Sequence, residues 1–277
     1  MIVVAALVVG LLLPPDEPEA ASIRKGALAA VAEANAAGGP VVVLKIRGRK
    51  GPWGSDAAEA ARLVEEDGAS VLIAPPDGSA THLVLQVSGR TGVPVFTLCA
   101  DSSVTKTAVP WVARVVPSTV EQARGVFAKT PGTRWLAVVP AARAGREAAR
   151  DLTAAKGSGV SLVTVEAGSW SGPDGLRDLR RVMSNIRPDA VLVWLPPTGA
   201  KDAVAAFRAT GYAGPVTVRS QAVPSPLEAY ARDAASLAIR VLRGPHGAEP
   251  RRAFPLAGGF VGATGRMTFD SSGNRSS

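Results

Sequence analysis

Short apolar runs alternate with segments of helical periodicity along most of the chain, and this order constrains the fold more than any other feature. The runs that predict strands are Val8–Leu13, Val41–Ile46, Val71–Ala74, Val95–Leu98, Trp135–Val139, Ser161–Val165, Ala190–Trp194 and Val216–Val218. The segments that predict helices are 26–39, Asp56–Glu66, Thr81–Thr91, Ser118–Lys129, Gly145–Lys156, Asp174–Asn185, Gly199–Thr210 and Pro226–Arg243. Strands that alternate with helices through short loops indicate parallel sheets covered on both faces. The predicted fold class is therefore α/β.

The alternation is interrupted at Thr107–Ser118. Two extended segments follow each other there, around Pro110 and Pro117, and Trp111–Val115 is one of them. An interruption of this kind is where one α/β lobe hands over to another. The sequence therefore predicts two α/β lobes rather than one long sheet.

The stretch "GALAAVAEANAAGG", residues 26–39, predicts an unusually thin helix. Alanine has the highest helix propensity, and its small side chain permits close packing on a sheet. Asn35 and Gly38-Gly39 are expected to end this helix, because glycine takes the left-handed conformation without a Cβ penalty. In the same way, Asp56 is predicted to be the N-cap of the following helix and Gly92 to end the one after it.

The length of 277 residues and the hydrophobic content of 47% allow one large domain or two modest ones. The first residues, "MIVVAALVVGLLLPP", are open to two interpretations. The run suits the apolar part of a signal peptide, but it lacks a basic start and a small-residue cleavage site. It is too short to span a bilayer comfortably, so no transmembrane segment is predicted. We favour a buried strand for Val8–Leu13, with Met1–Ala6 as its extension or as the remnant of a leader.

The net charge of +8 raises the question of an anionic partner. The basic residues are scattered, with only short pairs such as Arg180-Arg181 and Arg251-Arg252, and no aromatic residues are interleaved with them. A nucleic-acid interface requires a stripe or a cluster of basic residues. We therefore expect no specific nucleic-acid partner, and at most weak, salt-sensitive binding of DNA.

Few residues could support catalysis or bind a metal. Cys99 is the single cysteine, and His82 and His246 are the two histidines. The stretch "DGSATH" brings Asp77, Ser79 and His82 together, but a triad is defined by its geometry in space, and Ser79 lacks a Gly-x-Ser-x-Gly context. "GGFVGATG" leads into a strand and a turn, whereas a dinucleotide loop opens a helix. We expect no metal, no cofactor and no enzymatic activity.

Six blocks, in a fixed order, resemble the type I periplasmic (solute) binding proteins, which include the leucine/isoleucine/valine-binding proteins of ABC transporters. They are "GALAAVAEANAAGGPVVV", "DAAEAARLVEEDGASVLIAP", "TGVPVFTLCADSS", "VARVVPSTVEQARGV", "RPDAVLVWLPPTGAKDAVAAFRATGY" and "GATGRMTFDSSGNR". The resemblance implies two Rossmann-like lobes joined by a multi-segment hinge, with a small ligand in the cleft between them. Lobe one would hold residues 1–115 and 225–277, and a trimmed lobe two would hold residues 116–224.

The resemblance also implies a ligand site. Two loops, Asp77–Thr81 and Leu98–Ser102, match those that hold the ligand carboxylate in amino-acid binders. Trp53 either lines the cleft mouth or packs on its rim. The candidate ligand-binding residues are Trp53, Asp77, Gly78, Ser79, Cys99, Ala100, Asp101, Ser102, Pro196 and Gln221.

Several positions depart from the family pattern. Asp101 stands where the family usually has Thr, Ala144 and Pro196 replace aromatic residues, and Gln221 replaces an acidic residue. A stretch that normally follows Gln221 is missing. Because Asp101 would repel a carboxylate, we expect an amide, amine or polyol ligand rather than leucine, isoleucine or valine.

The function implied by the resemblance is binding of a small polar solute for an ABC-type uptake system. The implied location is periplasmic or otherwise extracytoplasmic, and the implied partner is a membrane permease. Three alternatives stay open: a ligand-sensing module that signals to a protein partner, an α/β enzyme, and a degenerate paralogue without a ligand.

Overall fold

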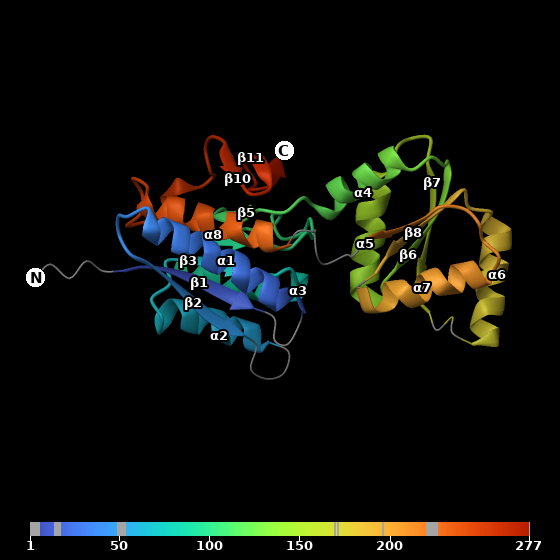
Figure 1. Cartoon of the computed structure of the whole chain (residues 1–277), viewed down its shortest axis with the longest axis horizontal. Coiled ribbons are helices and arrows are strands. Elements are labelled where there is room, and N and C mark those ends of the chain that lie inside the picture. The colour runs from blue at the N-terminus through green and yellow to red at the C-terminus, as the bar shows by residue number, and fades with distance from the viewer. Residues whose placement is uncertain are drawn as a thin grey trace, which may run out of the picture. The chain divides into compact units, whose positions relative to one another are not determined.

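The computed structural model describes residues 6–13, 18–48, 54–168, 170, 172–195, 197–219 and 227–276. The chain divides into two compact units. Unit 1 comprises Met1–Ser118 and Val223–Ser277, and unit 2 comprises Thr119–Ala222. Each unit has an open parallel sheet with helices on both faces (Figure 1). The α/β class predicted from the alternation of strands and helices is therefore confirmed.

The sheet of unit 1 has the order β2-β1-β3-β4-β5, and all its pairs are parallel. Its strands are β1 (Leu7–Leu13), β2 (Val42–Gly48), β3 (Val71–Ala74), β4 (Val95–Thr97) and β5 (Val112–Arg114). Helices α1 (Pro18–Ala36) and α8 (Leu227–Arg243) share one buried cluster with the sheet, and α2 (Ser55–Glu65) and α3 (Gly78–Thr91) share the other. Both faces of the sheet are thus covered by apolar contacts, which explains why β1 and β3 are apolar throughout.

The thin helix predicted from residues 26–39 packs against another helix as well as against the sheet. α1 and α8 lie side by side (Figure 1). A Cβ placed on Gly26 would lie 2.0 Å from the carbonyl oxygen of Glu228 in α8. The two backbones therefore meet at Gly26. The small residues of α1 allow this close contact between the two helices. The sequence had predicted close packing of α1 against the sheet alone.

The turn that ends α1 is built as the sequence predicted. Gly38 and Gly39 both have positive φ angles, of 83° and 92°. Asn35 adds a function that was not predicted. Its side-chain amide donates to the carbonyl oxygen of Val42 at 2.9 Å, and its Oδ1 accepts from the Val42 N–H at 2.9 Å. The end of α1 is thereby joined to the start of β2.

Several predictions about helix starts are wrong, since α1 begins at Pro18 and α5 (Ala142–Ala155) at Ala142, and those for α2 and α3 bear on the candidate site. Asp56 is not the N-cap of α2, because Gly54 occupies that position with φ 98° and no side chain caps the helix. Asp56 lies in the first turn instead. Helix α3 begins at Gly78 rather than at Thr81, so Gly78 and Ser79 belong to its first turn and Asp77 is its N-cap.

Unit 2 has a sheet of order β7-β6-β8-β9, again parallel. Its strands are β6 (Arg134–Val139), β7 (Ser161–Glu166), β8 (Ala190–Trp194) and β9 (Val216–Arg219). One face packs against α4 (Thr119–Lys129) and α5 (Ala142–Ala155), and the other packs against α6 (Pro173–Ile186) and α7 (Pro197–Ala209). Trp135 and Trp194 are fully buried on the first face and supply aromatic volume to a core otherwise built from aliphatic residues.

Unit 1 ends in a small antiparallel sheet beside α8. It consists of β10 (Phe260–Gly262), β11 (Gly265–Phe269) and β12 (Arg275–Ser276), and the 3-10 helix η1 (Pro250–Ala253) precedes it. Asp233 of α8 is buried, and its carboxylate accepts from the N–H groups of Ala263 and Thr264 at 2.6 and 2.9 Å and from the Thr264 hydroxyl at 2.5 Å. The "GATG" segment of the motif is therefore the turn that binds Asp233.

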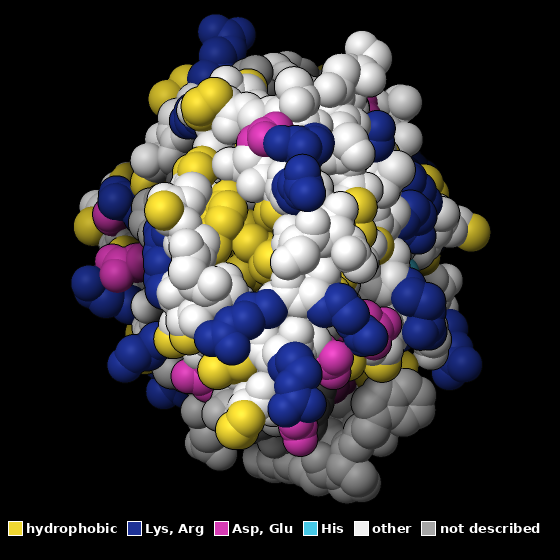
Figure 2. All heavy atoms as spheres, turned by 90° about the vertical axis from the view of Figure 1, so that its right-hand side faces the viewer, with side chains coloured by type: hydrophobic (Ala, Val, Ile, Leu, Met, Phe, Trp, Pro, Cys, Tyr) yellow, Lys and Arg dark blue, Asp and Glu magenta, His cyan; other side chains and the backbone are white. Residues whose placement is uncertain are grey.

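The basic excess is concentrated in unit 2. Residues 119–222 contain fourteen Lys and Arg against eight Asp and Glu. Figure 2 shows basic side chains spread over the face that it draws, with acidic ones beside several of them and hydrophobic side chains in a recess among them. On α6, for example, Arg177 lies 3.1 Å from Asp174 and Arg181 lies 3.2 Å from Asp178. Weak DNA binding stays a prediction. None of the described helices is both long and apolar enough to cross a bilayer.

Candidate functional site

The loops at the carboxyl ends of β3 and β4 form the candidate site of unit 1. In open α/β sheets, ligands bind beyond the carboxyl ends of the strands, close to the point where the strand order reverses. In unit 1 this point lies between β1 and β3. The loop after β3 contains Asp77, and the loop after β4 runs from Leu98 to Ser103. The first predicted ligand loop therefore flanks the reversal of strand order, and the second follows the neighbouring strand.

Asp77 shapes the first of these loops by capping α3. Its Oδ1 accepts from the N–H of Ala80 at 2.7 Å, and the Thr81 hydroxyl donates to the carbonyl of Pro75 at 2.9 Å. The first N–H groups of a helix have no partner within the helix. Those of Gly78 and Ser79 also find none elsewhere in the described part of the chain. They remain available as donors.

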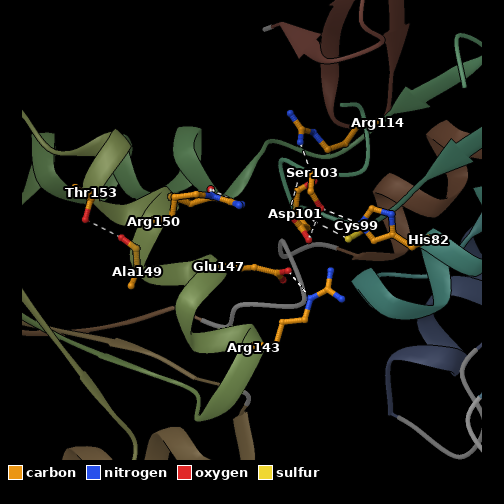
Figure 3. A network of polar contacts seen from close by, with 11 residues as sticks. His82, Cys99, Asp101, Ser103, Arg114, Arg143, Glu147, Ala149, Arg150 and Thr153 are labelled. Carbon is orange, nitrogen blue, oxygen red and sulfur yellow. Dashed lines mark hydrogen bonds and ion pairs between the residues drawn. The ribbon is translucent and has the colours of Figure 1, made fainter. Parts of the chain in front are cut away.

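Asp101 holds its own loop together (Figure 3). Its Oδ1 accepts from the N–H of Ser103 at 2.8 Å, and its Oδ2 accepts from the Ser103 hydroxyl at 2.9 Å. A Cβ placed on Gly78 would lie 3.3 Å from Oδ2, so the carboxylate stands against the first turn of α3. The partial positive charge at a helix N-terminus favours a carboxylate in this place. A carboxylate oxygen has two lone pairs, so each oxygen can still accept one more hydrogen bond.

His82 completes this chain of polar groups. Its Nε2 lies 2.9 Å from the Ser103 hydroxyl oxygen. With the Ser103 hydroxyl donating to Asp101, the His82 Nε2 takes the donor role toward that hydroxyl. A serine nucleophile needs the opposite arrangement, with the imidazole accepting the hydroxyl proton. Ser79, the serine of the "DGSATH" stretch, is exposed in the first turn of α3.

The thiol of Cys99 is buried under the same loop. Its Sγ accepts from the Asp101 N–H at 3.4 Å, and its main-chain N–H donates to the Thr97 hydroxyl at 3.0 Å. Burial raises the pKa of the Cys99 thiol to about 12. The thiol therefore stays protonated near neutral pH and acts as a small apolar group.

We expect Cys99 to resist a water-soluble disulfide reagent in the folded protein at about pH 8, where an ordinary exposed cysteine reacts. Full reaction of one thiol per chain is expected in urea, because unfolding restores an ordinary pKa. Absorbance of the released thiolate measures both rates. Equal rates in folded and unfolded protein would show that Cys99 is accessible.

Arg114 of β5 connects the Asp101 loop to the end of the chain. It is 3% exposed, and its guanidinium donates to the Asp101 carbonyl at 3.1 Å and to Oδ1 of Asn274 at 2.8 Å. Asn274 also accepts from the Thr105 hydroxyl and donates to Asp270. This positioning role was not predicted from the sequence. The sequence feature that indicates this role is the closing "GNR" of the hairpin motif. Its asparagine accepts hydrogen bonds from Arg114 and from Thr105.

Unit 2 has a cavity of about 710 Å³ where its own strand order reverses, between β6 and β8. Pro140 and Ala141 follow β6, and Leu195 follows β8. The described lining also includes Ala167, Gly168, Trp170, Leu176, Gly199, Asp202, Ala203, Ala205, Ala206 and Ala209. Trp170 packs edge-on against Phe207, with ring centroids 5.8 Å apart. The cavity is thus mostly apolar with one carboxylate, as in many small-molecule sites. Neither Trp170 nor Asp202 was among the predicted site residues.

Seven of the predicted site residues lie in the segments that follow β3 and β4, with Gly78 and Ser79 in the first turn of α3. Asp77 and Ser79 are exposed, whereas Cys99, Ala100 and Ser102 are buried, and Gly78 and Asp101 are intermediate. Trp53, Pro196 and Gln221 lie outside the described residues. Among the residues that the structure describes, no group of three or more His, Cys, Asp or Glu side chains could hold a metal ion.

Known proteins resemble this chain in sequence pattern and in fold. A family model described as periplasmic binding protein matches residues 8–253. No curated protein sequence is similar enough to match. Among solved structures, an ABC transporter substrate-binding protein from Desulfitobacterium hafniense, in complex with Leu, superposes with a TM-score of 0.83 at 17% identity, covering 98% of this chain and 95% of that one.

Two further structures have the same fold. The branched-chain amino acid transporter substrate-binding protein LivJ from Streptococcus pneumoniae, in complex with isoleucine, has a TM-score of 0.77 at 18% identity, covering 98% of this chain and 94% of that one. A solute-binding protein of an ABC transporter from R. palustris, in complex with 4-hydroxybenzoate, has a TM-score of 0.79 at 16% identity, covering 98% and 90%. Because the family model spans most of the sequence, the chain belongs to the periplasmic binding protein family.

Proposed function

We propose that this protein is the solute-binding component of an ABC-type uptake system, outside the cytoplasm, and that its partner is a membrane permease. Membership of the periplasmic binding protein family supports this proposal, and so do the ligands named for proteins of the same fold. The protein binds its solute without turnover. The Ser103 hydroxyl supports this part, because it donates to the Asp101 carboxylate rather than to the imidazole of His82.

The ligand class follows from the groups at the start of α3. Asp101 offers an ionised acceptor, and the N–H groups of Gly78 and Ser79 offer donors in the same first turn. A ligand carboxylate placed there would meet the Asp101 carboxylate, and juxtaposed like charges cost several kcal/mol. A carboxamide has both a donor and an acceptor. We therefore propose a ligand with an amide, and next an amine or polyol, rather than a free carboxylate at this position.

Benzamide and benzoate form a matched pair that tests this proposal, because they differ only in the group that would face Asp101. Benzamide is expected to bind at least about 100-fold more tightly than benzoate, as expected when a close like-charge pair is avoided. Leucinamide is expected to bind more tightly than leucine for the same reason. Isothermal titration calorimetry at one salt concentration gives all four affinities.

The variant Asp101→Asn removes the charge and keeps an oxygen that can accept from Ser103. It is expected to reduce the difference between amide and carboxylate to less than about 10-fold. Micromolar binding of leucine by the wild type, unchanged in Asp101→Asn, would show that the charge of Asp101 does not select the ligand. Hydrolysis of any amide in the series would contradict binding without turnover.

A further inference from the structure

A second cavity, of about 410 Å³, lies in unit 1 between the last turns of α8 and the small antiparallel sheet. Leu237 and Val241 of α8 form one side, and Phe260 of β10 and Phe269 of β11 form another. The segment Pro255–Gly258 supplies the remaining wall. None of these residues belongs to the loops that follow β3 and β4, so this cavity is separate from the candidate ligand loops.

The ionisable side chains along the described lining are all basic. They are Arg240 of α8, His246 just after it, and Arg252 of η1. Arg240 uses one N–H to bind the carbonyl of Gly259 at 3.2 Å. A guanidinium has five N–H donors, so most of those on Arg240 remain free for a ligand.

Two features near the cavity could neutralise this positive charge. Glu249 is one of them, and it lies 2.8 Å from Arg251 as well as 2.6 Å from Arg252. It is shared between two cations and does not line the cavity. The second feature is the C-terminal end of α8, which carries partial negative charge. There the N–H of Gly244 donates to the Val241 carbonyl at 3.3 Å. Three basic side chains and no acidic one therefore lie along the described lining of a mostly apolar cavity.

We propose that this cavity is a second small-molecule site and that its ligand is an amphipathic carboxylate with an apolar body and a single anionic head. The apolar walls take the body, and Arg240 and Arg252 take the head. The volume lies in the range of ordinary ligand pockets. Arginine suits the head because its planar fork matches the two oxygens of a carboxylate. This site would prefer an anionic group, whereas the Asp101 loop would disfavour one.

Octanoate is the probe, with octylamine and acetate as matched comparisons. Octanoate is expected to bind the full chain once, about 10-fold or more tightly than octylamine, and acetate is expected not to bind. The double variant Arg240→Gln, Arg252→Gln is expected to bind octanoate about 10-fold or more weakly than the wild type. Calorimetry measures these affinities, and Arg181→Gln on α6 is the control for loss of an exposed arginine.

Ala257 is exposed in the wall of the cavity, so Ala257→Trp is expected to block octanoate binding without disturbing the core. Ala128→Trp, at an exposed position of α4, is the matched control and is expected to change nothing. Equal binding of octanoate and octylamine would overturn the proposal, as would octanoate binding that persists in Ala257→Trp or fails at millimolar concentration. A dependence of octanoate binding on Asp101→Asn would place it at the α3 loops and overturn this site alone.

Discussion

Gly26→Ala is expected to lower the free energy of unfolding of unit 1 by about 3 kcal/mol. The added Cβ would lie 2.0 Å from the Glu228 carbonyl oxygen, a main-chain atom that cannot rotate away. Helices α1 and α8 would have to separate along their whole contact, and overpacking of this kind typically costs about 1–3 kcal/mol. Urea unfolding followed by circular dichroism measures the loss, and hydrogen exchange of peptides from α1 and α8 locates it.

Gly125→Ala is the matched control on α4. A Cβ at Gly125 meets nothing within 4 Å, and its φ is not positive. Alanine is favoured over glycine within a helix, so this variant is expected to gain about 0.5 kcal/mol. The same chemical change should therefore have opposite signs at the two sites. Equal stability of the two variants would mean that α1 and α8 are not in backbone contact at Gly26.

Asp233→Ala is the second variant with a large expected effect, a loss of about 3 kcal/mol. Asp233 is 1% exposed, and its carboxylate receives two N–H groups and one hydroxyl from the turn between β10 and β11. Hydrogen bonds to a charged group contribute about 1.5–3 kcal/mol, and removing the acceptor leaves buried donors without a partner. Thermal unfolding gives the size of the loss, and limited proteolysis reports release of the turn.

The effect should extend to the end of the chain, because Arg275 depends on the same turn. Arg275 donates to the Thr264 hydroxyl oxygen at 2.9 Å and to the Val115 carbonyl at 2.9 Å. Asp178→Ala on α6 is the control. Asp178 is 67% exposed and paired with a single arginine, so its loss is expected to cost less than about 0.5 kcal/mol. Comparable losses in the two variants would refute a special role of Asp233.

Local features of the sequence were enough to predict the sheets and their helices. The apolar runs of β1, β3, β6 and β8 are buried on both faces, which is the situation that such runs indicate. The turn at Gly38-Gly39 and the end of α3 at Gly92 follow from glycine's access to positive φ, and Gly92 has φ 73°. The start of α3 was misjudged because "DGSATH" resembles a loop, although Asp77 is a good N-cap.

The remaining features depend on residues that are far apart in the chain. Gly26 meets Glu228 across 202 positions, and Asn274 meets Arg114 across 160. The periodicity of apolar residues along the sequence gives no information about such distant pairs. The orientation of Asp101 toward Ser103 depends on which rotamer the loop after β4 allows, which a single sequence does not encode locally. The cavity of unit 2 requires three strand ends and two helices, α6 and α7, to converge, so its lining could not be assembled from any one segment.

The discontinuity of unit 1 affects how the protein is made. Unit 2 is one continuous segment, so all of its sheet and helices leave the ribosome together and can fold as a unit during synthesis. Unit 1 must wait, because α8 covers the same sheet face as α1 and is translated only after unit 2 is complete. Until then the face formed by residues such as Val9, Leu11 and Ile73 lacks half of its cover. The first strands to be synthesised are thus among the last to be shielded from water, and this interval is when the nascent chain is most exposed to aggregation.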